Sequence, residues 1–562
     1  MIAALVPRRV ATLLLILAPT AAFAQQGTAG VTAANPLAVD AGIEILKAGG
    51  SAVDAAVAVQ AMLGLVEPQS SGLGGGAFLM HFEAATGTVT MFDGREVAPA
   101  AASPRLLLDE DGEQLSMDAA VTSGRATGVP GVIPMLGVAH ARFGRLPWGR
   151  LFESAISSAR SGFVVPPRLG RFAAGPSIQA QQPDVKALFS RPDGAAARAG
   201  DVLRNPAYAA TLRLLAARGP RALHRGAVAR AIVTRTRASP RPGSMTLSDL
   251  AGYRPLRRTP LCRPYRGYAV CVPPPPSSGA SVLQLLGILD HTDIADRGPG
   301  DPQAWYLFAE ASRIMYADRD RYIADPAYAP VPVEGLLEPA YIASRAKLIA
   351  ERAGPAPPAG RPPGSVEGAD ATPEATGTSH FVVVDTRGNV VSMTSTIESL
   401  IGSGRAVGGF LLNNQMTDFS FLPSVAGTAA ANAVAGGKRP RSSMVPVIIL
   451  DAHGRFHAAL GSPGGSAIPA YTAKTLVALL AWKLPLQQAI DLPNLYARGD
   501  DVFGEASKLP PAVVEGLAVR GVVVRPGAGE DSGLHGVHMG APGGLEGAAD
   551  PRRDGTWKAI GR

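Results

Sequence analysis

The chain has 562 residues, of which 46% are hydrophobic and 17% charged, a composition that supports a large core and excludes an intrinsically disordered chain. The 65 glycines and 49 prolines follow no three-residue period, which excludes a collagen-like fibre. The formal net charge of +8 comes from scattered basic residues, a pattern typical of a solvated surface, so we expect no nucleic-acid binding.

The N-terminus has the pattern of an export signal. Arg8 and Arg9 precede an apolar run at 10–22, and the motif AFA ends at Ala24. We expect residues 1–24 to be a signal peptide, so that the protein is exported to the periplasm or secreted. An uncleaved anchor is the alternative, although the run is short for a membrane span. Later runs are shorter than a span needs, so we expect none in the mature form.

Two helices are predicted next, each with its own cap. Asn35 caps the first helix, and Ser51 caps a second, alanine-rich helix. The glycine-rich stretch at 67–76 follows and leads into two strands, at 77–82 and 89–92. Its glycines favour a close approach of backbone segments, and it lacks the pattern of a phosphate-binding loop.

The middle of the chain, from about 130 to 350, is predicted to be mostly helical, with one clear helix from Asp301 to Tyr322. The only cysteines, Cys262 and Cys271, flank a short turn. In an exported protein such a pair predicts a small structural disulfide. The sequence has neither CxxC nor HExxH nor a Cys/His cluster, so we expect no metal site.

A change in composition marks the segment 354–377, which is rich in proline and small residues. It predicts a flexible, solvent-exposed linker. Two strands, at 381–384 and 390–396, then flank a turn at 386–389, which is the pattern of a β-hairpin.

The expected register of this hairpin places Thr378 opposite Ile397. A slip of one residue would place it opposite Thr396 or Glu398, whose side chains share one face of the strand. Thr396 and Glu398 are therefore predicted neighbours of Thr378.

The linker ends abruptly at Gly377 and Thr378, which is typical of a processing site. If this bond is cut, Thr378 gains a free α-amine with a pKa of about 7.7–8.0, suited to activate its own hydroxyl as a nucleophile. On composition alone, an ordinary strand threonine is the alternative.

Nine motifs in a fixed order extend over nearly the whole chain after the signal. They are EPQSSGLGGG (67–76), DGRE (93–96), GVPG (128–131), PPPSSG (274–279), TSH (378–380), LNNQMTDFS (412–420), GKRPRSSM (437–444), GSPGG (461–465) and DPRRDG (550–555). By these motifs the chain resembles the γ-glutamyltransferase family (γ-glutamyl transpeptidase, glutathione hydrolase) of N-terminal-nucleophile hydrolases.

The resemblance implies an α+β fold, a four-layer αββα sandwich. It also implies a precursor that cuts itself between Gly377 and Thr378. The products would be a large subunit, 25–377, and a small catalytic subunit, 378–562, which stay together as a heterodimer. Thr378 would attack small-molecule γ-glutamyl donors and pass the acyl group to water or to amino-acid and peptide acceptors, with no metal or organic cofactor.

The resemblance also implies roles for individual residues, matched motif by motif. Thr396 would orient Thr378, and the N–H groups of Gly464 and Gly465 would form the oxyanion hole. The residues implied to hold the donor are Arg95, Ser442 and Ser443 for its α-carboxylate and Gln415 and Asp418 for its α-ammonium.

Two features depart from the family pattern and keep alternatives open. Glu398 stands where many members have Asn, and it could hold an ammonium or accept other acyl groups. The 23 residues between Asp418 and Ser442 have no aromatic residue after Phe421, so we expect a short or absent lid and an open pocket. A glutaryl acylase, as in the related cephalosporin acylases, is therefore the alternative enzyme, and a non-catalytic exported binding protein is a remote one.

Overall fold

The computed structural model of the chain describes residues 28–374, 377–527, 532–540 and 544–561. The predicted signal peptide, 1–24, lies outside the described residues. Among those that are described, none of the helices has the length and apolar character needed to cross a bilayer.

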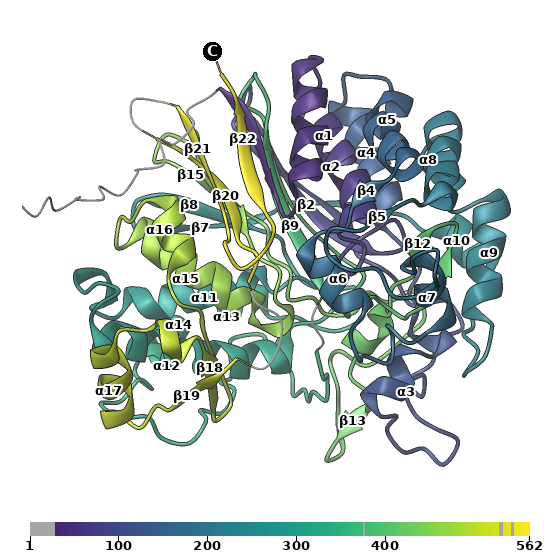
Figure 1. Ribbon diagram of the computed structural model, residues 1–562. Coiled ribbons are helices and arrows are strands. Elements are labelled where there is room, and N and C mark those ends of the chain that lie inside the picture. Colours follow the sequence, from purple (N-terminus) through teal and green to yellow (C-terminus); the bar gives the residue numbers. More distant parts are fainter. Residues whose placement is uncertain (1–27, 375–376, 528–531, 541–543, 562) are drawn as a thin grey trace, which may run out of the picture.

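Two β-sheets stacked face to face form the centre of the molecule (Figure 1). The larger sheet consists, in spatial order, of β22 (Thr556–Ile560), β1 (Ala29–Ala33), β9 (Thr378–Val384), β10 (Val390–Thr396), β2 (Gly76–Glu83), β3 (Thr88–Gly94) and β6 (Leu256–Arg258). The smaller consists of β21 (Leu545–Ala549), β20 (His535–Met539), β16 (Phe456–Gly461), β15 (Val447–Leu450), β8 (Tyr268–Val272) and β7 (Leu261–Tyr265).

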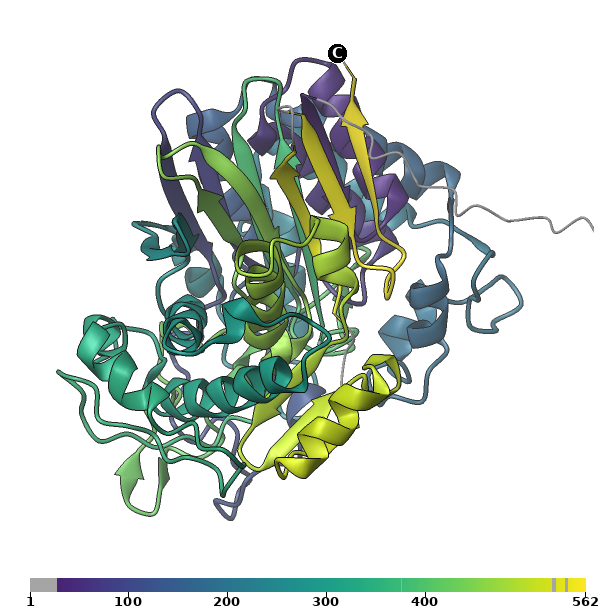
Figure 2. The ribbon, with the colours of Figure 1, turned by 90° about the vertical axis from the view of Figure 1, so that its left-hand side faces the viewer.

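Helices cover the outer face of each sheet. On the side of the seven-stranded sheet, the helices that contact its strands are α1 (Pro36–Lys47), α2 (Ala52–Val66) and α4 (Val132–Phe143). Further out, α5 (Glu153–Ser161) packs on α2, and α8 (Pro206–Arg218) packs on α5. On the side of the six-stranded sheet, the helices that contact its strands are α11 (Gly279–Asp290), α15 (Ile468–Leu480) and α16 (Leu486–Asp491). Further out, α12 (Pro302–Tyr322) and α14 (Pro339–Ala346) pack on α11, and α17 (Pro511–Val519) packs on α12. In Figure 2 the green and yellow strands lie in front of the purple helices on the far side.

Shorter elements surround this framework. The remaining helices are α3 (Met117–Val121), α6 (Pro167–Ala173), α7 (Pro183–Leu188), α9 (Gly226–Thr236), α10 (Leu247–Gly252) and α13 (Val333–Leu336). The remaining strands are β4 (Phe163–Val164), β5 (Val202–Leu203), β11 (Ala406–Val407), β12 (Phe410–Leu411), β13 (Ser424–Val425), β14 (Thr428–Ala429), β17 (Leu495–Arg498), β18 (Asp501–Gly504) and β19 (Val524–Pro526).

Three apolar layers hold the four structural layers together. Val57 of α2 and Val383 of β9 belong to the layer between helices and the large sheet. Phe78 and Ile448 belong to the layer between the two sheets. Leu476 of α15 belongs to the layer outside the small sheet. The strands at the centre are buried on both faces, which explains their nearly continuous apolar sequence. The fold is therefore the expected four-layer αββα sandwich.

Local sequence signals explain several elements. The Asn35 side chain accepts a hydrogen bond from the Leu37 N–H at the start of α1, and Ser51 forms a capping box with Asp54 at the start of α2. Both caps were predicted. The strands predicted at 77–82 and 89–92 are also present, extended to Gly76–Glu83 and Thr88–Gly94. The region 130–350 is mostly helical but also contributes strands to both sheets.

Candidate active site

Thr378 lies at the start of β9, in the middle of the seven-stranded sheet, and is 4% exposed. Thr396, at the end of β10, is its direct partner across the hairpin. The predicted register was thus wrong by one residue, and the slipped alternative is the correct one. The loop is centred on Arg387, because Gly388 adopts a left-handed backbone (φ 80°) that adds a residue to the turn.

The two threonine hydroxyls form a chain that ends on the bond expected to be cut. The Thr378 hydroxyl lies 3.4 Å from Thr396 Oγ1, to which it donates. The Thr396 hydroxyl in turn donates to the carbonyl oxygen of Gly377. The Glu398 N–H donates to Thr396 Oγ1 over 2.7 Å and fixes its orientation. The nucleophile candidate and the carbonyl that it would attack are therefore held by the same side chain.

Gly377 sits where no side chain fits. A Cβ at this position would collide with the backbone of Glu398 and Ser399. Glu398 itself has a left-handed backbone (φ 79°), which is costly for a residue with a side chain and is found mainly at functional sites. Gly377 and the strained backbone of Glu398 therefore pack directly against each other at the candidate cleavage point.

A buried network that was not predicted supports the backbone of Thr378. Arg553 donates to the Thr378 carbonyl oxygen over 2.9 Å, and Ser379 donates to Glu67 over 2.5 Å. Arg168 completes the network with an ion pair to Glu67 of 2.9 Å. Glu67 and Arg553 belong to motifs that were recognised, but only the tertiary structure shows that the two motifs meet below the nucleophile.

One side of the pocket, which we call the acidic wall, consists of Glu398, Asp418 and Gln415. Gln415 donates to Asp418 over 2.6 Å, and Glu398 accepts from Ser399 over 2.6 Å and from Asn414. Burial raises the pKa of Glu398 to about 8, and the charge of Asp418 adds to this rise. Burial also raises the pKa of Asp418, although Arg95 opposes it. The pair therefore retains a proton near neutral pH.

Arg95 comes from the end of β3 and is buried beside this wall. It forms an ion pair of 2.5 Å with Asp418. It also donates to the main-chain carbonyls of Arg441, over 2.6 Å, and Pro440, over 3.3 Å. The structure thus brings the expected carboxylate-binding and ammonium-binding residues together, paired with each other.

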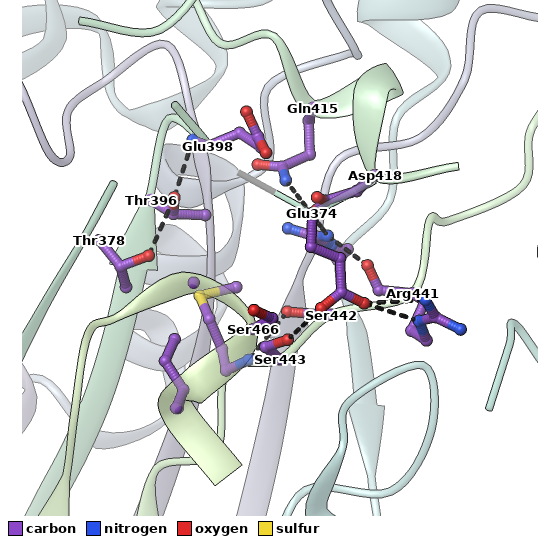
Figure 3. A pocket seen from close by; sticks show the side chains of 14 residues that line it. Glu374, Thr378, Thr396, Glu398, Gln415, Asp418, Arg441, Ser442, Ser443 and Ser466 are labelled. Carbon is purple, nitrogen blue, oxygen red and sulfur yellow. Dashed lines mark hydrogen bonds and ion pairs between the residues drawn. The ribbon is translucent and has the colours of Figure 1, made fainter. Parts of the chain in front are cut away.

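A cluster of three arginines, which we call the basic wall, consists of Arg319, Arg441 and Arg498, and it reaches the pocket lining through Arg441. These arginines surround the carboxylate of Glu374, with nearest N–O distances of 2.8, 2.8 and 3.6 Å respectively. Figure 3 shows this carboxylate pointing toward Ser443 and Arg441, with Thr378 and Thr396 across the pocket. Burial would raise the pKa of Glu374, but the three arginines outweigh it and hold the pKa below its usual range.

The expectation of a solvent-exposed linker is therefore wrong for its last part. Asp370 pairs with Arg441 at 3.0 Å, Thr372 is buried, and Glu374 is 7% exposed. Ala369 forms a bridge with Ala430. Local composition suggested exposure, but the charged residues of this segment find buried partners that are distant in sequence.

The two serines of the GKRPRSSM motif lie between the walls. The Ser443 hydroxyl accepts from Arg319 over 2.6 Å and lies 3.3 Å from Glu374. The Ser442 hydroxyl accepts from the N–H of Met444 over 3.2 Å. Both serines line the pocket, together with Gly465 and Ser466. Gly464 (φ 134°) and Gly465 (φ 57°) form the turn before α15 that only glycine adopts without strain.

The other predicted features lie outside this pocket. Cys262 and Cys271 are directly opposite each other in β7 and β8 and are joined by a disulfide. In the described structure, residues 419–440 contribute no side chain to the pocket lining; they include the β13–β14 hairpin and pack on 369–371. Among the described residues, no group of three His, Cys, Asp or Glu side chains is arranged to hold a metal ion.

Comparison with curated proteins places the chain among processed hydrolases. It is 34% identical over 542 residues to the glutathione hydrolase proenzyme of Bacillus subtilis (strain 168), covering 94% of this chain and 89% of that protein. It is 36% identical over 544 residues to the acylase ACY 1 proenzyme of Pseudomonas sp. (strain SE83), covering 95% and 94%.

Solved structures agree with this placement. The cephalosporin acylase from Bacillus halodurans superposes with a TM-score of 0.84 at 26% identity, covering 98% of this chain and 99% of that one. The γ-glutamyltranspeptidase of Helicobacter pylori gives 0.53 at 29% identity, covering 56% and 90%. A sequence model described as gamma-glutamyltranspeptidase matches residues 38–560. The chain therefore belongs to the γ-glutamyltranspeptidase family.

Proposed function

We propose that this protein is a self-processing γ-glutamyl hydrolase and transpeptidase that acts on glutathione and related compounds. The observation that carries the proposal is the pocket itself. Thr378 and Thr396 line it beside an acidic and a basic wall. A γ-glutamyl group ends in a zwitterion, an ammonium and a carboxylate on one carbon, and needs both signs of charge next to a nucleophile.

In the proposed processing step, Thr378 Oγ1 loses its proton and attacks the carbonyl carbon of Gly377. The C–N bond then breaks, the Thr378 nitrogen takes up a proton, and an ester joins the two residues. Water hydrolyses the ester to a Gly377 carboxylate and the free Thr378 hydroxyl. The large subunit, 25–377, and the small subunit, 378–562, would stay together because their strands alternate in one sheet.

In the proposed turnover, the freed α-amine of Thr378 takes the hydroxyl proton, and the oxygen attacks the γ-glutamyl amide carbon. The leaving amine departs with that proton, and water or an acceptor amine then attacks the acyl-enzyme. The N–H groups of Gly464 and Gly465 would stabilise the oxyanion, each contributing roughly 3–4 kcal/mol.

In the proposed donor complex, the zwitterion replaces the ion pair between Arg95 and Asp418. The α-carboxylate turns to Arg95, Ser442 and Ser443. The α-ammonium turns to Asp418, Gln415 and Glu398. Arg95 and Asp418 thus each exchange an internal partner for a substrate group of the same charge, so little charge is left unpaired.

The test is a denaturing gel of the purified protein, with N-terminal sequencing of the smaller band. We expect two bands, the smaller beginning at Thr378, and turnover of γ-glutamyl-p-nitroanilide. Thr378→Ala should give one band and no turnover, whereas Thr378→Ser keeps a hydroxyl and should retain processing. Two normal bands from Thr378→Ala would remove Thr378 from the mechanism.

A glutaryl acylase is the second candidate, favoured by Glu398 and by the identity to the acylase ACY 1 proenzyme. A protonated Glu398 leaves the acidic wall with less charge for an ammonium. The test compares kcat/KM for γ-glutamyl-p-nitroanilide and glutaryl-p-nitroanilide. A glutaryl preference of about tenfold or more would favour the acylase.

We also propose that the protein is exported. The support is the N-terminal pattern ending at Ala24. N-terminal sequencing of the larger band from the periplasmic or secreted fraction should begin at Gln25. A larger band that retains Met1 and stays in the cytoplasm would contradict export.

A further inference from the structure

The glycine turn between β16 and α15 has no side chains at its centre to hold it. Gly464 (φ 134°) and Gly465 (φ 57°) both adopt backbone conformations that favour glycine, and their N–H groups are the proposed donors to the substrate oxyanion. Glycine has more backbone freedom than any other residue, and oxyanion donors act best when they are fixed before the reaction. The turn must therefore be held at its two ends.

The first end of the turn is held by the small sheet. Gly461 is the last residue of β16 and is paired with His535 of β20. A Cβ at Gly461 would lie 2.5 Å from the ring of His380, so this buried ring packs directly on the glycine. Backbone pairing and the ring together fix the point at which the chain leaves the sheet.

The second end is held by a tyrosine from a distant helix. The hydroxyl of Tyr316, on α12, donates to the carbonyl oxygen of Ser466 over 2.5 Å. Ser466 directly follows Gly465 and lines the pocket. Tyr316 is fully buried, and burial raises the pKa of its hydroxyl well above the usual value of 10, so the hydroxyl remains a donor throughout the neutral range.

The ring of Tyr316 is itself fixed from several sides. The ring of Tyr496, on β17, meets it edge to face, with centroids 5.1 Å apart and planes at 83°. The guanidinium groups of Arg319 and Arg498 lie 5.6 and 5.8 Å from its centroid. The Tyr496 hydroxyl also donates to Ser466 Oγ over 3.3 Å. Two tyrosines from different elements therefore hold the backbone and the side chain of one residue beside the turn.

Processing makes a different demand on the site. The carbonyl attacked in processing is that of Gly377, and its oxygen already accepts a hydrogen bond from the Thr396 hydroxyl. Thr396 ends β10 in the large sheet, whereas the glycine turn follows β16 in the small sheet. The oxyanion of processing can therefore be stabilised by Thr396 without the turn.

The inference rests on the proposed function and deepens it. We propose that Tyr316 is a positioning residue for turnover: by holding the Ser466 carbonyl, its hydroxyl keeps the N–H groups of the glycine turn pointing toward the substrate oxyanion. Tyr316 acts through the turn and does not touch the substrate. Cutting of the chain, which Thr396 supports, does not depend on it.

The first experiment compares full-length Tyr316→Phe with the wild type. The variant keeps the buried ring and removes only the hydroxyl. With γ-glutamyl-p-nitroanilide, kcat should fall about tenfold or more while KM changes by less than about threefold, because the oxyanion forms only in the transition state. On a denaturing gel, the two bands should appear as fast as in the wild type. An unchanged kcat, or a parallel loss of kcat, substrate binding and processing, would overturn the proposal.

A matched control lies on the same helix. Tyr306, also buried on α12, donates its hydroxyl to the carbonyl oxygen of Ala350 over 2.7 Å. Tyr306→Phe therefore removes the same kind of hydrogen bond at a residue that does not line the pocket. It should lower the thermal unfolding midpoint about as much as Tyr316→Phe does and leave kcat unchanged. An equal fall of kcat in both variants would show lost stability rather than lost positioning, and would overturn the proposal.

The second experiment separates the transition state from the ground state. The inhibitor 4-boronobutanoate has boron in place of the reacting carbon of a glutaryl group. Thr378 Oγ1 would lose its proton to the free α-amine and form a bond to boron, which becomes a tetrahedral anion like the transition state. Tyr316→Phe should raise the inhibition constant of the boronate about tenfold or more, and that of trigonal glutarate by less than about threefold. Equal changes for the two inhibitors would show a merely structural role and overturn the proposal.

These outcomes separate two failures. If the wild type is neither cut nor active, the proposed function fails, and the inference fails with it. If the wild type is cut and active and Tyr316→Phe matches it, only the inference fails. If Tyr316→Phe does not fold, Tyr496→Phe, which releases the Ser466 side chain, should lower kcat about threefold with KM and processing unchanged; an unchanged kcat would then overturn the proposal.

Discussion

Each wall of the pocket has a buried glutamate in contact with it, Glu398 at the acidic wall and Glu374 at the basic wall, and the pKa values of the two are shifted in opposite directions. On the acidic wall, Glu398 faces the carboxylate of Asp418 and neutral amides, and its pKa rises to about 8. On the basic wall, Glu374 faces three arginines, and its pKa falls below the usual range. Both carboxyl groups are deeply buried.

Burial alone therefore does not decide the charge of a carboxyl group. Burial raises the pKa of both glutamates, because low polarity disfavours the ionised form. The number of nearby arginines then decides the outcome. The acidic wall can therefore lose or gain a proton near neutral pH, whereas the basic wall keeps its charges fixed.

The largest effect is expected from Arg441→Gln, made in the T378A chain so that the compared proteins all stay uncut. The substitution leaves Asp370 and Glu374 buried with fewer partners. The free energy of unfolding should fall by about 3–5 kcal/mol, measured by urea denaturation at neutral pH. A change as small as that of the control Arg455→Gln, which removes an arginine that is 74% exposed, would show that the basic wall does not depend on Arg441.

Glu398→Gln, in the same T378A chain, should change the dependence of stability on pH. The folded pKa of Glu398 is raised, so the folded protein binds more protons than the unfolded chain between about pH 4.5 and pH 8. Stability from this group therefore falls as the pH rises, by at most about 1.4 kcal/mol per pH unit. T378A/E398Q should lose this decline. Parallel curves for the two proteins between pH 5 and pH 8 would contradict the raised pKa.

Glu374→Gln should change the pH dependence of stability by less than Glu398→Gln does, and in the opposite direction. The folded pKa of Glu374 is lowered, so its contribution is complete above the ordinary value of 4.5 and is lost as the pH falls below it. At neutral pH the T378A/E374Q chain should be less stable than T378A by about 1–3 kcal/mol. This deficit should shrink below pH 4.5. If T378A/E374Q were more stable than T378A at pH 7, the charge of Glu374 would be unfavourable in the folded protein, as that of Glu398 is, and the contrast between the two walls would be wrong.

The hairpin at the centre of the site was predictable because its signals are local. Apolar strands flank a turn with Gly388, and this pattern gave both strands and the approach of Thr396 to Thr378. The register was wrong by one residue, because a single left-handed glycine changes the length of the loop. Side-chain roles at Arg95, Asp418 and Ser443 came from the resemblance and remain predictions.

The basic wall was not predictable, because its members are distant in sequence. Arg319 lies on α12, Arg441 lies in the segment before β15, and Arg498 ends β17. Each reads locally as a surface arginine. Glu374 lies in a segment whose composition is that of a linker, and only the folded chain reveals that three arginines converge on it. Tertiary charge pairing overrides local composition here.

The order of strands in the large sheet determines how a cut molecule would recover after unfolding. β1 and β2, which precede Gly377, flank the hairpin β9–β10, which follows it. An intact chain can regain this order by itself, at a rate independent of concentration. Two separated fragments would have to meet and thread their strands between each other, so their recovery after unfolding would slow with dilution. A cut molecule would then owe its persistence to slow unfolding rather than to reversible folding.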